Sequence, residues 1–205
     1  MKRVKKGQAG YIKSEKVRRF IITLVMFALP IGLYSIGLAI NGTNKSILTV
    51  VAILGVLPAA KFCVDFIMIM LQKSAPEELI RRTEETAPNL VRGYELTVTA
   101  YEGRMPLDAL VICGNDIAAF TVNGDPKQLG FFEKHIEKSL HADGYHAVNI
   151  KIFREERAFF DRIKDLSSDP LKHRAGIRAQ EDQTPEEAAA AHENGIFYTI
   201  KLISI

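Results

Sequence analysis

The stretch that decides the fold runs from Phe20 to Ile40 and reads FIITLVMFALPIGLYSIGLAI. Its 21 residues carry no charge, and a second apolar stretch, Ile47 to Leu71, follows as ILTVVAILGVLPAAKFCVDFIMIML. A bilayer core of ~30 Å takes about 20 helical residues, so each stretch is long enough to cross it. Because lipid offers no partner to backbone N–H and C=O groups, we expect both stretches to be helices. The short turn between them, NGTNKS, predicts a two-span hairpin with spans at residues 20–40 and 47–71.

Basic residues gather ahead of the first apolar stretch. Residues 1–19 carry a net charge of +7, whereas the turn between the two stretches carries only Lys45. Lysine and arginine are enriched on the cytoplasmic side of spans, so we expect the N-terminus in the cytoplasm and a second span that returns the chain there. The same side chains can contact anionic lipid headgroups. The basic residues of this tail are Lys2, Arg3, Lys5, Lys6, Lys13, Lys16, Arg18 and Arg19.

A cleaved signal peptide is the competing interpretation of the first stretch. The apolar region of a signal peptide usually has about 7–15 residues, and this stretch is longer and is followed directly by a second span. We therefore predict an integral protein of the plasma membrane. The compact turn and the small size favour a bacterial inner membrane.

Two ionisable residues, Lys61 and Asp65, interrupt the second stretch. Their i, i+4 spacing places them on one helix face, where they can form an ion pair. Lys61 lies 14 residues beyond Ile47, which is ~21 Å along a helix that crosses ~30 Å of hydrocarbon. A lysine at that depth can extend its amine to the headgroups. We therefore favour an anchoring role for this pair over an ion or proton pathway.

Small residues recur at four-residue spacing in both stretches, Ala28 with Gly32 and Gly55 with Ala59. In lipid, small residues let two helix backbones approach closely, so these pairs are candidates for the contact between the helices. Chance in segments rich in alanine and glycine is the alternative, and the sequence does not decide between the two interpretations.

The third part of the chain, residues 73–205, follows the tail (1–19) and the hairpin (20–71) and carries a net charge of −5. Its apolar periodicity predicts a cytoplasmic α+β sheet domain with the element order α-β-β-β-α-β-α-α-β. Residues 167–183 are expected to be irregular and mobile. The expected helices cover residues 75–86, 126–143, 155–166 and 185–194, and the expected strands cover residues 94–101, 108–113, 117–122, 147–153 and 196–205.

Cap signals set the limits of these helices. Ser74 and Glu77 have the spacing of a capping box before the first helix, and Asp125 is a natural N-cap of the second. Thr184 opens a capping box before the last helix, which Asn194-Gly195 is expected to end. The second helix has the clearest apolar stripe, formed by Leu129, Phe132, Ile136 and Leu140.

The stretch Leu107-Asp108-Ala-Leu-Val-Ile, a turn, and the stretch Ile117-Ala-Ala-Phe-Thr-Val form the second and third predicted strands. With the order α-β-β-β-α-β over residues 75–153, they resemble the core of the restriction-endonuclease-like PD-(D/E)xK nucleases. The likeness is strongest to the nuclease-related domain of the NERD type. In that family an aspartate opens one strand and an E-x-K motif closes the next. The resemblance implies that Asp108 stands at the aspartate position.

The E-x-K position departs from the family pattern, because it reads Thr121-Val122-Asn123. In such sites carboxylates hold Mg²⁺ and a lysine helps to activate water. Thr121 and Asn123 supply neither group, so the resemblance implies an inactive nuclease fold. Asp108 also has a simpler interpretation, as a turn residue that caps a strand after Pro106.

Other patterns that carry chemistry are missing from the sequence. The five histidines have no HExxH spacing, the two cysteines have no C-x-x-C spacing, and no phosphate-binding glycine motif occurs. We therefore predict neither a metal site nor a cofactor. Cys113 lies in an apolar strand, so we expect it to be buried rather than nucleophilic.

These patterns favour a membrane-anchored cytoplasmic module that binds a protein partner or a second copy of itself and is not an enzyme. We do not expect nucleic acid as a partner, because the basic charge sits in a short tail beside apolar sequence. The alternative is a divergent metal-dependent enzyme with the nuclease fold, for which Asp108 is the candidate catalytic residue.

Overall fold

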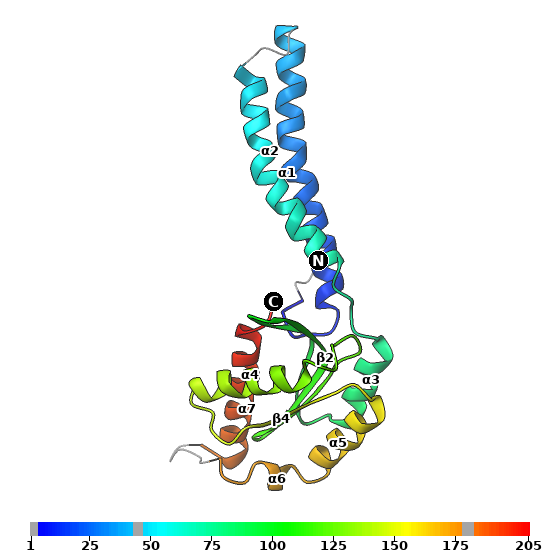
Figure 1. The fold of residues 1–205 in the computed structure, drawn as a ribbon, viewed down its shortest axis with the longest axis vertical. Helices are drawn as coiled ribbons and strands as arrows, with labels where there is room; N and C mark the ends of the chain where they lie inside the picture. The colour runs from blue at the N-terminus through cyan, green and yellow to red at the C-terminus, as the bar shows by residue number, and fades with distance from the viewer. Residues whose placement is uncertain (1–3, 43–46, 178–182) are drawn as a thin grey trace. The chain divides into compact units, whose positions relative to one another are not determined.

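The computed structural model describes residues 4–42, 47–177 and 183–205. The chain divides into two compact units (Figure 1). The hairpin unit covers Tyr11–Ser74, and the sheet unit combines residues 4–10 with Ala75–Ile205. The expected basic tail is therefore divided. Residues 4–10 belong to the sheet unit, and residues 11–19 form the first turns of a helix.

The hairpin unit consists of two helices, α1 (Tyr11–Asn41) and α2 (Ile47–Met70). Both are long and apolar enough to cross a membrane, with mean hydropathies of 2.1 and 2.3 over their most apolar windows. The predicted span 20–40 lies inside α1. The helix α2 covers all but the last residue of the predicted span 47–71.

The two helices pack side by side and antiparallel (Figure 1). Thr23 Oγ1 donates a hydrogen bond to the Phe62 carbonyl at 3.1 Å, and the Phe20 and Phe66 ring centroids lie 5.6 Å apart. The large apolar side chains point outward from this contact. Those that are 60% or more exposed include Leu24, Leu29, Ile31, Ile47 and Leu57.

The sheet unit is built on a four-stranded mixed sheet in the order β1-β2-β3-β4. The strands β1, β2 and β3 are antiparallel neighbours, and β4 runs parallel to β3. A tight turn joins β2 to β3, as the sequence predicts, and it consists of Gly114 and Asn115, because Asp116 already pairs with Cys113. The strand bounds are Val91–Ala100 for β1, Gly103–Cys113 for β2, Asp116–Phe120 for β3 and Asn149–Phe153 for β4.

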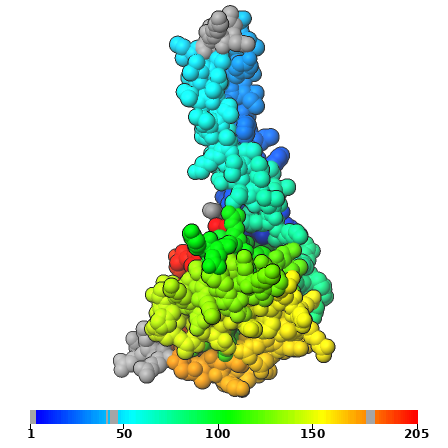
Figure 2. Space-filling model, in the orientation of Figure 1, coloured from blue at the N-terminus to red at the C-terminus, as the bar shows by residue number. Residues whose placement is uncertain are grey.

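Helices cover both faces of this sheet (Figure 1). The helices α4 and α7 pack on one face around Leu110, while α3 and α5 pack on the other around Val111. Figure 2 shows α4 in yellow-green and α5 in yellow forming much of the face turned toward the viewer. The helix bounds are Glu77–Thr86 for α3, Leu129–Ala142 for α4, Glu156–Ser168 for α5, Pro170–His173 for α6 and Pro185–Leu202 for α7.

Both terminal segments of the chain cover the outer edge of β1. The Tyr94 N–H donates to the Gly7 carbonyl at 3.0 Å, and the Ile205 N–H donates to the Thr97 carbonyl at 2.9 Å. An open edge strand presents unpaired backbone groups to other chains, and this cover satisfies them. The N-terminal segment is thereby fixed to the sheet unit.

The predicted terminal strand, residues 196–205, is wrong, and the observed order in the sheet unit is α-β-β-β-α-β-α-α-α. The helix α7 continues through this stretch to Leu202 and buries Ile196 and Ile200 completely. Branched and aromatic residues favour strands locally, but burial of this helical stripe outweighs that preference. Strand-like contacts to β1 are kept by the last residues, where Ser204 forms an isolated bridge to Val98 and the Ile205 N–H donates to the Thr97 carbonyl.

Asn194-Gly195 does not end α7, because Gly195 has a packing role. A Cβ atom at Gly195 would clash with the hydroxyl oxygen of Tyr145, which precedes β4. Glycine inside a helix is tolerated where a neighbouring group must come close. The capping box of Thr184 and Glu187 is confirmed at the start of this helix.

Two predicted helix starts are wrong. The helix α3 begins at Glu77 after Pro76 and has no side-chain cap, so Ser74 does not cap it; the Ala75 N–H donates to Glu95 Oε1 at 3.2 Å. The helix α4 begins at Leu129, and Asp125 caps the turn before it rather than the helix itself. The apolar stripe of α4 is confirmed, with Phe132, Ile136 and Leu140 fully buried.

The segment 167–183, expected to be irregular, is ordered in its first part. The helix α5 runs to Ser168 and the short helix α6 follows at once. Asp169 caps α6 by accepting a hydrogen bond from the Lys172 N–H. Residues 178–182 lie outside the described residues.

Candidate functional site

Asp108 lies buried in β2. Its Oδ2 accepts a hydrogen bond from the Val122 N–H at 2.7 Å. Burial raises the pKa of the Asp108 carboxyl group, and this hydrogen bond opposes the shift in part. Asp108 and the segment 121–123 are therefore neighbours, and the contact between them that we observe is made by a backbone N–H group.

Thr121 is buried too, and its Oγ1 accepts a hydrogen bond from the Gly124 N–H at 2.9 Å. Among the residues that the structure describes, no group of three or more His, Cys, Asp and Glu side chains is arranged to hold a metal ion. The geometry gives Asp108 and Thr121 the role of fixing the chain as it leaves β3. The nuclease resemblance itself stays a prediction.

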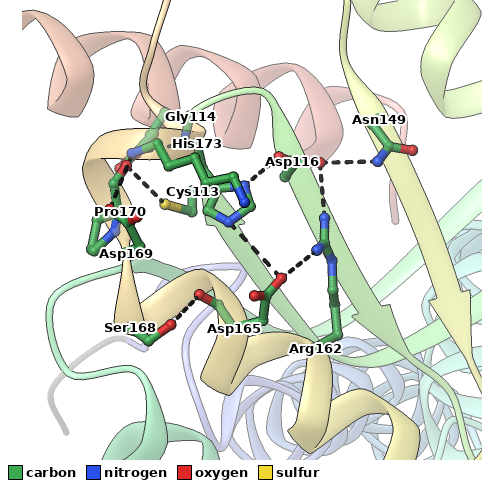
Figure 3. Close-up of polar contacts among 12 residues, drawn as sticks. Cys113, Gly114, Asp116, Asn149, Arg162, Asp165, Ser168, Asp169, Pro170 and His173 are labelled. Carbon is green, nitrogen blue, oxygen red and sulfur yellow. Dashed lines mark hydrogen bonds and ion pairs between the residues drawn. The ribbon is translucent and has the colours of Figure 1, made fainter.

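A cluster of polar side chains lies where β2 turns into β3 (Figure 3). We call it the Asp116 cluster, and it consists of Asp116, Asn149, Arg162, Asp165 and His173. Asp116 Oδ1 accepts hydrogen bonds from Asn149 at 2.9 Å and from Arg162 at 3.0 Å. Asp116 Oδ2 lies 2.7 Å from His173 Nδ1, and Arg162 also donates to Asp165 at 2.7 Å.

A histidine between two carboxylates is an arrangement that acid–base catalysis uses. His173 Nε2 lies 4.0 Å from Asp165, on the side of the ring away from Asp116. Both oxygens of Asp116 are already occupied by donors of the protein itself, and the His173 side chain is only 10% exposed. The cluster thus holds α6 and α5 against the sheet without needing a ligand.

Cys113 lies beside this cluster at the end of β2 and is fully buried. Burial, together with the nearby carboxylate of Glu193, raises the pKa of its thiol to about 11. A thiol with that pKa is protonated at neutral pH and is a poor nucleophile. The prediction that Cys113 is buried is confirmed.

Glu193 of α7 forms a buried ion pair with Arg174, which follows α6. The Arg174 Nε and Nη2 atoms lie 2.8 and 3.0 Å from the two carboxylate oxygens, and the Glu193 side chain is only 1% exposed. The Gly114 N–H donates to the same carboxylate at 2.7 Å. A Cβ atom at Gly114 would clash with the His173 carbonyl. These contacts fix the chain after α6 against the β2–β3 turn.

Sequence reasoning missed these contacts, because it assigned residues 167–183 to a mobile segment. One signal was present in the sequence. Glu193 lies at helical spacing from Ala189 and Ile196, both of which are buried. An acidic residue on an apolar helix stripe requires a buried partner, since an unpaired buried charge is very unfavourable.

A groove of about 430 Å³ opens between α3 and α5. The Arg82 guanidinium lies 4.1 Å from the centroid of the Phe160 ring and pairs with Glu156. The groove is also lined by Arg157, Asp161 and Lys164, which are exposed. Side chains of both charges around one aromatic ring suit a charged peptide segment better than a small apolar ligand.

The ion pair that the spacing of Lys61 and Asp65 allows is not formed between these two residues in the structure. Lys61 is exposed, and the Asp65 carbonyl accepts a hydrogen bond from Arg19 Nη1 at 3.2 Å. Glu15 pairs with Arg18 at 2.7 Å and with Arg19 at 3.5 Å. The polar contact between α1 and α2 here therefore runs through Arg19. The anchoring role of Lys61 stays a prediction.

Of the four small residues predicted to lie in the helix contact, two lie there and two do not. Gly55 faces α1, because a Cβ atom there would lie 3.5 Å from Pro30 Cβ, and Ala59 is fully buried. Ala28 is exposed, and a Cβ atom at Gly32 would meet nothing within 4 Å. The pair in α2 lies in the helix contact, whereas the pair in α1 does not, since Pro30 takes that place.

Lys6 does not extend freely toward lipid, as the sequence suggests, because it binds the end of α7. Its Nζ donates to the Lys201 carbonyl at 2.8 Å and to the Ser204 carbonyl. The last carbonyl groups of a helix lack partners and attract a cation. Burial and the neighbouring Lys201 lower the pKa of Lys6. Lys13 and Lys16 lie on the first turns of α1, and Lys2 and Arg3 lie outside the described residues.

No family model matches this chain, and comparisons with curated proteins and with solved structures give no match either. Its function must therefore be argued from the geometry of its own residues.

Proposed function

We propose that the protein is a membrane-anchored cytoplasmic binding module. The helices α1 and α2 cross the bilayer as a hairpin, and the sheet unit stays on the cytoplasmic side. There it binds a protein partner or a second copy of the chain. The tether confines the module to the inner membrane surface and raises its effective concentration for partners at that surface.

The observation that carries the proposal is the membership of residues 4–10 in the sheet unit. The chain leaves this unit at Gly10 and rejoins it at Ala75, and the two apolar helices lie between. A folded unit attached to both ends of a two-helix hairpin lies on one side of the bilayer that the hairpin spans. The Gly7–Tyr94 hydrogen bond and the Lys6 contacts support that attachment.

The distribution of charge supports a cytoplasmic location of the sheet unit. The eight basic residues of the sequence before Phe20 contrast with the single Lys45 between the helices. The positive-inside rule retains the side with more lysine and arginine in the cytoplasm.

The groove between α3 and α5 is the surface that we propose for binding. Three of its charged side chains, Arg157, Asp161 and Lys164, are exposed. Complementary charges on a partner could pair with them and set its orientation. The Asp116 cluster is a poorer candidate, because its hydrogen-bonding groups are already used within the protein.

Single cysteine residues test the anchoring and the binding in one experiment. The background is Cys63→Ala, and Cys113 is kept because its thiol is buried and its raised pKa makes it unreactive. We expect an impermeant maleimide to label Thr43→Cys in intact cells, because residue 43 lies between the two spans. Lys164→Cys and the matched control Lys172→Cys should be labelled only after permeabilisation.

A photoreactive maleimide on the same cysteines then reports binding. It should crosslink Lys164→Cys to a protein partner or a second copy and leave Lys172→Cys, which is also exposed, uncrosslinked. Labelling of Lys164→Cys from outside intact cells would overturn the topology. Equal crosslinking from both positions would overturn the groove as the binding surface.

A further inference from the structure

One end of the sheet unit carries both terminal segments of the chain and the β1–β2 turn. Gly7 and Gly93 approach the Phe197 ring so closely that a Cβ atom on either residue would clash with it. Residues 203–205 run along the edge of β1 and hydrogen-bond to it. We call this surface the terminal face and define it as residues 4–10, 100–104 and 201–205.

Large apolar side chains project from the terminal face. Tyr101, at the tip of the β1–β2 turn, is fully exposed, and Leu202 and Ile205 are 62% and 45% exposed. Because Ser204 bridges to Val98 in antiparallel register, Leu202 lies alongside the end of β1, next to the turn. An aromatic and two aliphatic side chains exposed on one surface indicate a contact site.

The terminal face also carries basic side chains. Arg104 and Lys5 are exposed, and Lys201 Nζ lies 4.7 Å from the centroid of the Phe197 ring. Glu102 is the acidic residue of the turn. Tyrosine with lysine and arginine is the combination enriched where membrane meets water. Protein interfaces, in contrast, are depleted in lysine, so the composition favours lipid over a protein partner.

We propose that the terminal face lies on an anionic lipid surface, with Tyr101 at the level of the headgroups. This inference rests on the proposed membrane anchoring of the hairpin. Gly7 is four residues from the start of α1, which is at most ~14 Å of extended chain. The turns of α1 before Phe20 add ~14 Å, so a membrane that holds α1 lies within reach of this face.

Electrostatic attraction and apolar insertion act together on such a face. Lysine and arginine near an anionic surface are attracted to it over about one Debye length, ~8 Å at physiological ionic strength. The tyrosine ring is amphipathic and prefers the headgroup level to either water or hydrocarbon. The short tether removes most of the loss of freedom that a separate binding event would cost.

Leu171 supplies the matched control elsewhere on the same unit. It is 77% exposed on α6, which packs beside the Asp116 cluster at the β2–β3 end of the sheet. The β1–β2 turn lies at the other end of β2. Asp165 and Asp169 are exposed near Leu171 beside the basic Lys172, so this region lacks the excess of basic side chains that the terminal face has.

The sequence contains no tryptophan, so a single introduced tryptophan reports its own surroundings. The full chain is reconstituted in vesicles of phosphatidylcholine with phosphatidylglycerol, part of the lipid carrying bromine near the headgroup. Bromine quenches tryptophan fluorescence only at close range. We expect quenching of Tyr101→Trp at least about twofold stronger than that of Leu171→Trp. Pure phosphatidylcholine or high salt should weaken the quenching of Tyr101→Trp.

A third variant, Leu57→Trp, keeps this inference separate from the anchoring of the hairpin. Leu57 is 70% exposed on α2, so its replacement should be quenched by bromine placed deep in the acyl chains. Quenching of Leu57→Trp with no excess for Tyr101→Trp over Leu171→Trp would overturn the terminal-face inference alone. If the quenching of Tyr101→Trp does not change with lipid charge or salt, the inference that the bound lipid surface is anionic is overturned. An unquenched Leu57→Trp would overturn the anchoring itself.

Discussion

The hairpin unit and the sheet unit use the same apolar residues in opposite ways. Leu57 in α2 is 70% exposed, whereas Leu110 in β2 is fully buried. Of the three buried residues of α2, two are small, Ala52 and Ala59, and the third is Ile69. A helix pair in lipid gains little from hiding a leucine, so small residues occupy its contact, while a unit in water buries its largest apolar side chains. This difference is what the proposed anchoring of the hairpin in a membrane requires, because burial then follows the solvent that each unit meets and not hydrophobicity alone.

The environments of polar and small residues also differ between the two units. Lys61 in α2 is exposed, whereas Glu193 in α7 is buried and bound on both carboxylate oxygens. A Cβ atom at Gly55 would make an ordinary contact with α1, whereas one at Gly195 would clash with Tyr145. The sheet unit should therefore tolerate small changes poorly, and the hairpin should tolerate them well.

Glu193→Ala should have the largest effect on the sheet unit. The substitution leaves the Arg174 guanidinium and the Gly114 N–H without their acceptor, and breaking a buried ion pair costs about 3–5 kcal/mol. Urea unfolding of the full chain in detergent, followed by circular dichroism, measures this loss. Glu186→Ala, one exposed residue of the same helix, should change the free energy of unfolding by less than about 0.5 kcal/mol. Equal effects of the two substitutions would contradict the buried pair.

Gly195→Ala should have the next largest effect. The new methyl group meets the Tyr145 hydroxyl, and overpacking of this kind costs about 1–3 kcal/mol. Removal of that hydroxyl in the double variant Gly195→Ala, Tyr145→Phe should recover part of the loss. Gly55→Ala in the hairpin should cost little, because its Cβ atom would lie 3.5 Å from Pro30 Cβ. A Gly55→Ala variant as damaged as Gly195→Ala in detergent would break the comparison between the two units.

Asp108→Asn should give the smallest and most pH-dependent effect. Burial raises the pKa of the Asp108 carboxyl group in the folded state, so the group favours folding most below its unfolded pKa of about 3.9 and loses that contribution as pH rises through the folded pKa. Asp108→Asn can still accept the Val122 N–H but does not titrate. Its stability relative to the native chain should therefore rise between acidic and neutral pH.

Asp108→Ala serves as the control for this titration, because it removes the acceptor altogether. It should cost about 1–3 kcal/mol at neutral pH, the usual result of leaving a buried N–H group unpaired. Thermal unfolding of both variants across pH measures the two effects. A constant difference between the native chain and Asp108→Asn at every pH would show that the carboxyl group does not titrate as its burial requires.

Local patterns predicted the parts of the fold that depend on neighbours in sequence. The α4 stripe is an example, because Phe132, Ile136 and Leu140 share one helix face whatever else the chain does. The misplaced elements depended on distant partners. Gly195 has the pattern of a helix stop, but in the structure it leaves room for the Tyr145 hydroxyl inside α7. Ser74 has the spacing of a helix cap, but the chain before α3 is held by a distant residue, Glu95, which accepts the Ala75 N–H.

The candidate site was the least predictable part of the molecule. Asp108 and Thr121 were singled out by the sequence, and both are buried, but their hydrogen bonds fix the chain as it leaves β3. The Asp116 cluster was missed, because Asp116 and His173 are 57 residues apart. The groove between α3 and α5 was missed as well, because Arg82 and Glu156 are 74 residues apart. No local pattern connects side chains across such separations.

The sequence alone determined that two long apolar helices stand next to each other, because span length and the absence of charge are properties of a continuous stretch. It also determined the apolar stripe that α4 presents to the sheet. Only the tertiary structure decided that Lys6 binds the last carbonyls of α7, 195 residues away in the sequence. It likewise decided that Glu193 reaches Gly114 across 79 residues. Such contacts form only after the core has brought distant segments together, since each polar group then needs a partner that water no longer supplies.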